Sequence, residues 1–347
     1  MPLPTIVLSA IVACYRDEKT IGPMAERLTQ VFLRLGVTYE IIFVNDASPD
    51  GSRAVLDRLA LSDSRVKVIA HSRNFGSQSA FYSGLRVARG EACIFLDGDL
   101  QDPPEVIPAF FQKWGDGFDV VYGIRDRREM AWVAEIFYRA YYRIFRWFAS
   151  IDVPVDASDF SLMDRNVCDA LLALPERDLY LRALRSWVGF RQTGVVYHRP
   201  KRKHGSSGYS VLAKLRWGKR EILSFSGRPV EWASTAALVG AIVSVVVAGA
   251  VGGDLLVHGG DSAQRLLFAA LFLGGIQLFG LFVVVEYVGR IFEEIKRRPR
   301  AIVSGTQNLE ALGAALPAAP DKTIASAPES RVGDRRASDR HCRSDHP

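Results

Sequence analysis

The alternation of strand-like and helix-like apolar segments over the first 125 residues constrains the fold most strongly. Short runs of β-branched and other apolar residues, typical of buried strands, alternate with segments whose apolar residues recur at helical spacing. Thr20 is expected to cap the first helix and Gly36 to end it. This order favours an α/β fold, a mostly parallel sheet with helices on both faces. The expected strands are 5–13, 39–45, 66–70, 92–96 and 118–123, and the expected helices are 21–35, 52–61 and 77–88.

The polar segment 96–105, LDGDLQDPPE, follows one of these predicted strands. In parallel α/β sheets, ligands bind beyond the carboxyl ends of the strands. Asp97 and Asp99 flank a glycine there, and Gln101 can add a neutral oxygen. Such oxygen ligands suit Mg²⁺ or Mn²⁺ together with a bound phosphate. An acidic turn without further function is the alternative, because Asp, Gly and Pro are common in loops.

Two other loops also follow predicted strands. Asp46 lies in FVNDASPDGS, where its carboxylate is expected at the mouth of the sheet, within reach of a nucleotide base or ribose. A simple tight turn is the alternative. Arg73 precedes a helix that starts near Ser77, and an arginine beside a helix N-terminus can attract phosphate. The alternative is a surface arginine before an ordinary helix.

The second half of the chain changes character. Aromatic residues and arginines interleave over 132–148, which indicates a helix that either packs on the sheet or lies in a membrane interface. The apolar runs 232–251 and 266–288 each have about the 20 residues that a bilayer span needs. Basic residues outside both runs predict a cytoplasmic N-terminal domain and C-terminus. A helical hairpin buried in a soluble protein is the alternative, and residues 301–347 are expected to be a disordered tail.

The net charge and the cysteines indicate which kinds of partner and metal site are compatible with the chain. A formal net charge of +6 favours an anionic partner, either nucleic acid, phospholipid or a phosphorylated substrate. The four cysteines show no C-x-x-C spacing, which argues against a zinc site or a redox pair. Scattered single thiols are typical of a reduced, cytosolic environment.

Several segments, taken in order, resemble the motifs of the family-2 glycosyltransferases of the GT-A fold. The closer resemblance is to the polyprenyl-phosphate glycosyltransferase branch, and it covers roughly residues 5–300. The matching segments are CYRDE at 14–18, VNDASPDGS at 44–52, RNFG at 73–76, LDGDLQDPPE at 96–105, DFSLMDR at 159–165, RKHGSSGYS at 202–210 and the apolar stretch 274–299. The chain departs from the usual motif residues at Ala13, Arg16, Asp17, Ser161 and Gly208.

The resemblance implies an inverting hexosyltransferase, anchored in the inner membrane and dependent on Mg²⁺ or Mn²⁺. It would transfer glucose or a similar hexose to undecaprenyl or dolichyl phosphate at the cytoplasmic face. UDP-glucose is the favoured donor and GDP-mannose the alternative, with no nucleic acid partner and a homo-oligomer allowed. One rival is a processive polysaccharide synthase, although RALRSW at 182–187 lacks the glutamine of the Q-x-x-R-W motif. The other is an inactive membrane scaffold.

The resemblance also implies domains and residue roles. Residues 1–128 would bind the nucleotide sugar, 129–228 would form the acceptor side with interfacial helices, and 229–300 would form two transmembrane helices with a basic exit helix. Asp159 and Asp99 would be catalytic, and a helix cap is the alternative role for Asp159. The donor would contact Ala13, Tyr15, Asp17, Asp46, Arg73 and Asp97. The metal would be held by Asp97, Asp99 and Gln101, and the acceptor phosphate by Arg202, Ser206 and Tyr209.

Overall fold

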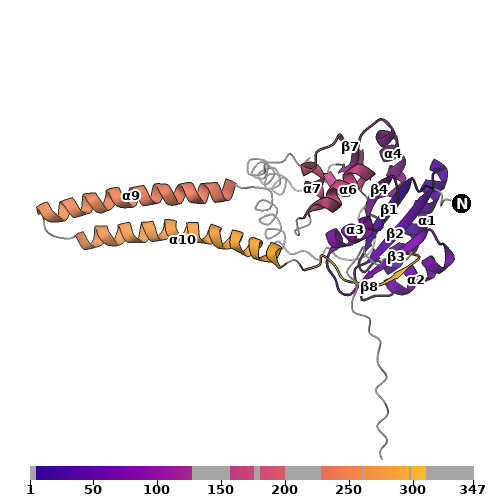
Figure 1. The fold of residues 1–347 in the computed structure, drawn as a ribbon, viewed down its shortest axis with the longest axis horizontal. Helices are drawn as coiled ribbons and strands as arrows, with labels where there is room; N and C mark the ends of the chain where they lie inside the picture. The colour runs from indigo at the N-terminus through magenta and orange to yellow at the C-terminus, as the bar shows by residue number, and fades with distance from the viewer. Residues whose placement is uncertain are drawn as a thin grey trace, which may run out of the picture.

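The computed structural model describes residues 5–126, 157–175, 180–199, 228–258, 262–296 and 298–309. These residues form an α/β body and a pair of long helices that project away from it (Figure 1). The segment 132–148, predicted to be an interfacial or packing helix, lies outside the described residues.

The α/β body is built on an eight-stranded sheet of order β7-β5-β6-β4-β1-β2-β3-β8. Strands β6 and β8 are antiparallel to their neighbours, and the other pairings are parallel, so the predicted mostly parallel sheet is confirmed. The strands are β1 (Leu8–Cys14), β2 (Tyr39–Asn45), β3 (Val66–His71), β4 (Ala92–Asp97), β5 (Val120–Arg125), β6 (Ala157–Asp164), β7 (Gln192–Tyr197) and β8 (Val303–Gln307).

Helices cover both faces of the sheet, each over its own apolar cluster. Alternate residues of β1 divide between the two clusters, since successive side chains of a strand point to opposite faces. One face packs against α1 (Glu18–Leu35), α2 (Ser52–Ser62) and α4 (Ile107–Gly115), which follows the short helix η1 (Pro104–Val106). The other face packs against α3 (Ser77–Leu85), α6 (Arg165–Ala173) and α7 (Leu181–Trp187).

The ends of α1 test the predicted helix signals. Gly36 ends the helix in the left-handed conformation, with φ of 66°, as expected. The predicted start at Thr20 is wrong, because α1 begins at Glu18 and Asp17 occupies the N-cap position. Thr20 instead lies in the first turn, where its hydroxyl donates to the Asp17 carbonyl.

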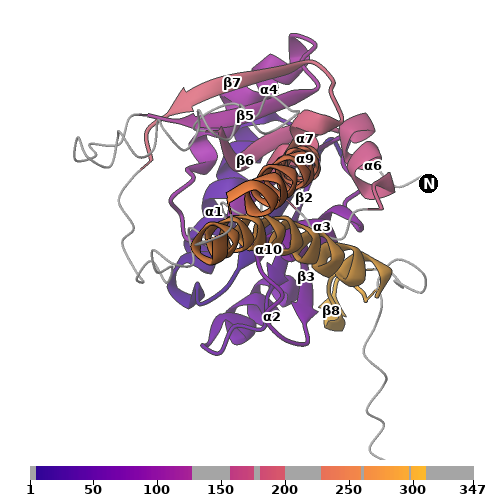
Figure 2. The same cartoon turned by 90° about the vertical axis from the view of Figure 1, so that its left-hand side faces the viewer.

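The projecting pair consists of α9 (Arg228–His258) and α10 (Ser262–Ile295), which pack side by side. Figure 2 looks along this pair toward the α/β body. Residues 252–258 and 262–265, which lie between the two apolar runs, are therefore helical as well. Both helices expose large apolar side chains, among them Ile242, Val246, Leu278 and Phe282.

The prediction of a membrane-spanning protein requires a correction. A helix that crosses a bilayer must be both long and predominantly apolar. Among the residues that the structure describes, no helix meets this requirement. The predicted multi-pass location in the inner membrane is therefore wrong, and the predicted transmembrane helices are not confirmed. The assignment of the catalytic domain and C-terminus to the cytoplasmic face of a membrane loses its basis.

The segment after α10 returns to the sheet, although it was expected to begin a disordered tail. Strand β8 pairs with β3 and covers that edge of the sheet. The Asn308 amide donates to the carbonyls of Ala60 and Val66, which fixes the end of the strand. The Arg300 guanidinium lies 4.1 Å from the Tyr82 ring centroid and donates to the Leu174 carbonyl.

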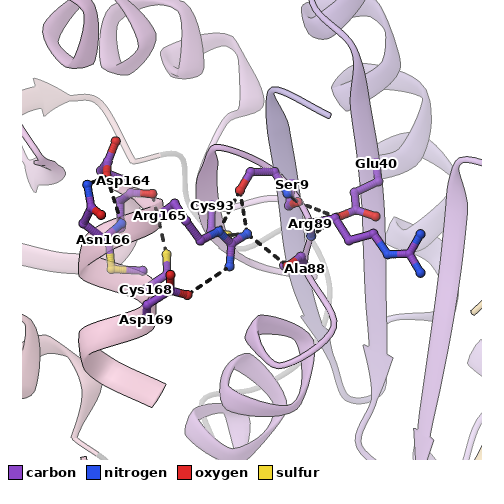
Figure 3. Close-up of polar contacts among 12 residues, drawn as sticks. Ser9, Glu40, Ala88, Arg89, Cys93, Asp164, Arg165, Asn166, Cys168 and Asp169 are labelled. Atoms are coloured by element: carbon purple, nitrogen blue, oxygen red, sulfur yellow. Dashed lines mark hydrogen bonds and ion pairs between the residues drawn. The ribbon is translucent and has the colours of Figure 1, made fainter. Parts of the chain in front are cut away.

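The amino edge of the sheet, where the parallel strands begin, carries a buried polar network (Figure 3). The Glu40 carboxylate accepts hydrogen bonds from the Ser9 hydroxyl and the Arg89 backbone N–H, and it pairs with Lys67. The Arg165 guanidinium donates to the carbonyls of Ala88 and Gly90. These contacts join β1, β2, β3 and the loop that leads into β4. Each of the polar side chains named here has a hydrogen-bond or ion-pair partner.

Candidate functional site

The topology brings residues from four strands to the opposite, carboxyl edge. Strand β6 runs antiparallel between β4 and β5, so its first residues lie beside their carboxyl ends. Phe95 pairs with Ser161, and two residues further along each strand Asp97 comes opposite Asp159. Arg125 pairs with Tyr197 at the same edge. Residues 62 positions apart in the chain, Asp97 and Asp159, are thereby placed together by strand register alone.

The ends of β1 and β4 are in close contact around Gly98. Its backbone N–H donates to the Ala13 carbonyl over 2.9 Å. A Cβ at this position would lie 2.8 Å from the Asp17 carboxylate and 3.0 Å from the Ala13 carbonyl. Asp17 in turn accepts a hydrogen bond from the backbone N–H of Tyr15. The residue Tyr15 is 40% exposed. Glycine therefore lets the loop of Asp97 and Asp99 approach the predicted donor residues at the end of β1.

Three of the five non-glycine residues with positive φ in the described chain lie at this edge, and the other two, Phe190 and Asn308, lie beside the start of β7 and the end of β8. Arg16, Ala47 and Leu100 have φ of 62°, 54° and 59°, although none is a glycine. They follow β1, β2 and β4, the parallel strands at the centre of the sheet. Left-handed conformations in non-glycine residues cost energy and are concentrated at functional sites. The grouping of three such residues in the loops after β1, β2 and β4 favours a functional site at this edge without reference to any sequence motif.

Acidic residues crowd the loop after β4. Burial, together with the nearby charges of Asp102, Asp159 and Asp99, raises the pKa of Asp97 to about 8. Burial also raises the pKa of Asp102, although its ion pair with Arg199 and the hydrogen bond donated by Tyr197 oppose the shift. The same burial and the Asp102 charge raise the pKa of Tyr197 to about 12. A cation placed among these carboxylates would relieve their repulsion.

Asp159 has a different environment from Asp97. Burial would raise its pKa, but the charge and hydrogen bond of Arg182 and the charges of Arg185 and Arg125 hold it below its ordinary value. Arg182 Nη2 lies 3.1 Å from Asp159 Oδ2. Asp159 is therefore ionised at neutral pH. The alternative that Asp159 caps a helix is wrong, since Asp164 occupies the N-cap of α6.

Arg185 lies one helical turn after Arg182 on α7 and is only 2% exposed. Its Nη1 is 3.5 Å from the Ser158 carbonyl, and its guanidinium lies 5.1 Å from the Tyr122 ring centroid. Burial lowers the pKa of Arg185 to about 10, although the Asp159 charge opposes the shift. The site thus contains a charged guanidinium with few partners.

Asp46 is placed differently from the expectation. It is buried, and one carboxylate oxygen accepts from His71 Nδ1 and the Phe75 N–H while the other accepts from the Gly76 N–H. His71 also lies 2.9 Å from the Ser83 hydroxyl. Asp46 therefore anchors the loop before α3, on which Arg73 is exposed and stacks on the Phe75 ring at 4.1 Å.

The predicted metal ligands share one turn, in which the Gln101 backbone N–H donates to the Asp99 carboxylate. Within the described parts of the chain, no three His, Cys, Asp or Glu side chains are grouped so that they could hold a metal ion. Asp97, Asp99 and Gln101 as metal ligands remain a prediction. Arg202, Ser206 and Tyr209, the predicted acceptor contacts, lie outside the described residues.

Sequence reasoning missed several residues of this site. Asp102 lies within LDGDLQDPPE, and Arg182 and Arg185 lie within RALRSW, but neither segment suggested a role for them. Arg125, Tyr197 and Arg199 have no motif that would single them out. The signal that could have found them is position, because each follows or flanks a strand that ends at the carboxyl edge.

Comparisons with known proteins show the family of the chain. Residues 9–172 match the model of the family described as glycosyl transferase family 2. The uncharacterized glycosyltransferase YkcC of Bacillus subtilis is 38% identical over 88% of this chain and 95% of its own length. The SfII prophage-derived bactoprenol glucosyl transferase of Shigella flexneri is 35% identical over 85% of this chain and 97% of its own.

The uncharacterized glycosyltransferase sll0501 of Synechocystis is 36% identical over 89% of this chain and 98% of its own length. Among solved structures, mannosyl-3-phosphoglycerate synthase from Rubrobacter xylanophilus is 16% identical, with a TM-score of 0.44 over 63% of this chain and 73% of that one. This structural likeness is too low to support a conclusion. The sequence relationships suffice: the chain belongs to glycosyl transferase family 2, in the polyprenyl-phosphate branch that includes the prophage-type bactoprenol glucosyl transferases, and it is a hexosyltransferase.

Proposed function

We propose that this protein transfers one hexose, glucose in the first instance, from a nucleoside-diphosphate donor to a polyprenyl phosphate with inversion at the anomeric carbon. The observation that carries the proposal is the carboxyl edge, where β4 ends at Asp97, Asp99 follows it and Asp159 lies opposite Asp97. The bactoprenol glucosyl transferase names of relatives that align over nearly their whole length support the acceptor and the sugar.

The donor would bind across the ends of β1, β2 and β4. Tyr15 is exposed there and Asp17 lies against the Gly98 turn, so both can contact the nucleoside. Asp46 would act through the loop it anchors, and it would place Arg73 near the donor phosphates. This arrangement leaves the diphosphate beside Asp97 and Asp99.

A divalent metal, Mg²⁺ or Mn²⁺, fits the chemistry of this loop. Mg²⁺ is commonly bound by only one or two carboxylates together with substrate phosphates, so a cluster of three protein carboxylates is not required. The crowding that raises the pKa of Asp97 is what a bound cation would relieve. When bound, the metal would offset the negative charge that develops on the leaving nucleoside diphosphate. Asp97 and Asp99 would hold it, with Gln101 as a neutral oxygen.

Asp159 would orient the acceptor and the sugar rather than remove a proton. A phosphate monoester has a second pKa of about 6, so the acceptor is largely dianionic at neutral pH and needs little help from a base. The pKa of Asp159, held below its ordinary value by Arg182, also makes the carboxylate a weak base.

The test is to incubate the purified full-length chain with radiolabelled UDP-glucose, GDP-mannose or other nucleotide sugars, Mg²⁺ or Mn²⁺, and undecaprenyl phosphate in detergent. Label should pass into the lipid fraction with one sugar, in a single transfer, and the product should be of inverted configuration. A product with many sugars would favour the processive synthase, and no transfer with any donor would reject the proposed function.

A further inference from the structure

Arg185 is the least compensated buried cation among the described residues of the site. The hydrogen-bonding atoms Nε and Nη2 of its guanidinium have no partner within the described parts of the chain. Its remaining contacts are a 3.5 Å bond to the Ser158 carbonyl and the face of the Tyr122 ring. An ionised group is rarely buried in this way, because desolvation costs several kcal/mol unless an opposite charge is present.

The nearest carboxylate, Asp159, supplies that charge only in part, because Arg182 shares it. Asp159 directs its Oδ2 at Arg182, and its Oδ1 has no partner in the described residues. Arg182, Arg185 and Asp159 together therefore carry one positive charge in excess. The other groups that face Arg185 are the side chains of Tyr122 and Tyr180, neither of which is a carboxylate.

The position of Arg185 in the sheet separates it from the donor loop. Strand β6 lies between β4, which ends at Asp97, and β5, which contains Tyr122. Arg185 stacks on Tyr122 and bonds to Ser158 of β6, so Asp159 lies between Arg185 and the loop of Asp97 and Asp99. An anion bound at Arg185 would face the donor diphosphate across Asp159.

We propose that Arg185 binds the phosphate of the acceptor and holds it for attack on the donor sugar. The inference rests on the proposed function and names the residue that receives the second substrate. A guanidinium offers paired N–H donors matched to phosphate oxygens, and Nε and Nη2 lie on one edge of that group. One phosphate oxygen forms the new bond to the anomeric carbon. The bond from that carbon to the donor diphosphate breaks, and its electron pair leaves with the nucleoside diphosphate.

The test compares Arg185→Met with the wild type and with Arg53→Met, which replaces a half-buried arginine of α2 that pairs with Asp57 away from the site. In steady-state assays, Arg185→Met should raise the KM for undecaprenyl phosphate or lower kcat, with a ten- to hundredfold loss in kcat/KM for the acceptor. The KM for the nucleotide sugar should stay within about twofold. Arg185→Lys should recover part of the loss, because a point charge lacks the paired donors.

A binding readout separates this inference from the reaction itself. Farnesyl phosphate, a short soluble isoprenyl phosphate, should raise the melting temperature of the wild type and of Arg53→Met but not of Arg185→Met. If the wild type binds farnesyl phosphate yet transfers no sugar, the proposed function fails while the assignment of Arg185 stands. If Arg185→Met is stabilised as much as the wild type, or if the wild type is not stabilised, the assignment is overturned.

Two more results would overturn it. One is a loss of donor affinity with an unchanged acceptor KM, which would place Arg185 at the donor diphosphate. The other concerns stability, since removal of an uncompensated buried cation should leave the melting temperature of the unliganded protein equal or higher. If Arg185→Met does not fold, then an acceptor KM in Arg185→Lys equal to that of the wild type would show a structural role.

Discussion

The two edges of the sheet differ in how well their polar groups are satisfied. At the amino edge, Glu40, Ser9, Lys67 and Arg165 are buried or half-buried and their hydrogen bonds and ion pairs are made. At the carboxyl edge, three non-glycine residues adopt left-handed conformations, Asp97 is crowded by other carboxylates, and atoms of Asp159 and Arg185 lack partners in the described residues.

This difference between the edges indicates that the amino edge mainly stabilises the fold and the carboxyl edge mainly serves function. Buried polar groups are nearly always paired in stable proteins, so unpaired groups and strain persist only where something else selects for them. The Glu40 network at the amino edge follows the rule and joins the strands there, although the buried Tyr39 hydroxyl at the start of β2 has no partner in the described residues. The carboxyl edge departs from the rule where ligands bind in parallel α/β sheets. We expect substitutions at the first edge to lower stability, and substitutions at the second to lower activity while stability holds or improves.

Asp97→Asn gives the largest expected effect on activity. Loss of one carboxylate should lower kcat/KM at least a hundredfold, about 2.7 kcal/mol at 25 °C, since the metal would lose a ligand. Because the raised pKa of Asp97 makes folding of the metal-free protein take up a proton at neutral pH, the neutral amide should at the same time raise the free energy of unfolding by roughly 1–3 kcal/mol. Glucose transfer and urea unfolding measure the two effects. A variant that is both inactive and less stable would break the proposed contrast between the edges.

Arg165→Met should do the reverse at the amino edge. The substitution leaves the buried carbonyls of Ala88 and Gly90 without their guanidinium donors, and each lost partner costs about 1–3 kcal/mol. The free energy of unfolding should fall by roughly 2–4 kcal/mol, while kcat/KM per folded molecule stays within about threefold of the wild type. A drop in kcat/KM without a change in stability would show that Arg165 belongs to the site after all.

Much of the fold could be predicted from the sequence because its first half is locally consistent. The predicted strand 39–45 has the bounds of β2, and the predicted helix 52–61 is one residue shorter than α2. Each element has its own periodicity and its own turn signals, so no distant contact is needed to identify it. The carboxylates after β4 follow from the same logic, since a strand that ends in acidic residues places them at the carboxyl edge.

The rest of the site depends on contacts between distant residues. Arg182 and Arg185 acquire their role only when β6 inserts antiparallel between β4 and β5, which no local pattern reveals. Asp46 was expected to be free to contact a nucleotide because it follows a predicted strand, but its carboxylate is bound by His71 and by the backbone N–H groups of residues 75 and 76. The apolar runs 232–251 and 266–288 predicted helices correctly, yet their length alone did not establish a membrane span.

Gly98→Ala tests how closely the strand ends must approach. The added methyl group would lie 2.8 Å from the Asp17 carboxylate and 3.0 Å from the Ala13 carbonyl, which is backbone and cannot move freely. We expect the free energy of unfolding to fall by about 1–3 kcal/mol and the KM for the nucleotide sugar to rise severalfold, because Asp17 and Asp97 must separate. Gly115→Ala is the control, since a Cβ there meets no atom within 4 Å. Equal effects in both variants would show that the contact at Gly98 is unimportant.

Ala47→Gly gives the smallest expected effect and tests whether the strain itself is selected. Ala47 has φ of 54°, a conformation that costs a non-glycine residue roughly 1–2 kcal/mol, whereas glycine in the unfolded chain loses about 0.5–1 kcal/mol more entropy on folding. The net change should be a gain in stability of up to about 1.5 kcal/mol. Gly36→Ala, at the left-handed end of α1 with φ of 66°, should instead lose about 1 kcal/mol, although a Cβ there meets no atom within 4 Å. Urea unfolding of both variants gives the two signs. If Ala47→Gly gains stability and keeps full activity, the left-handed conformation of Ala47 contributes neither to stability nor to activity. The evidence for a strained functional edge then comes from Arg16 and Leu100 alone.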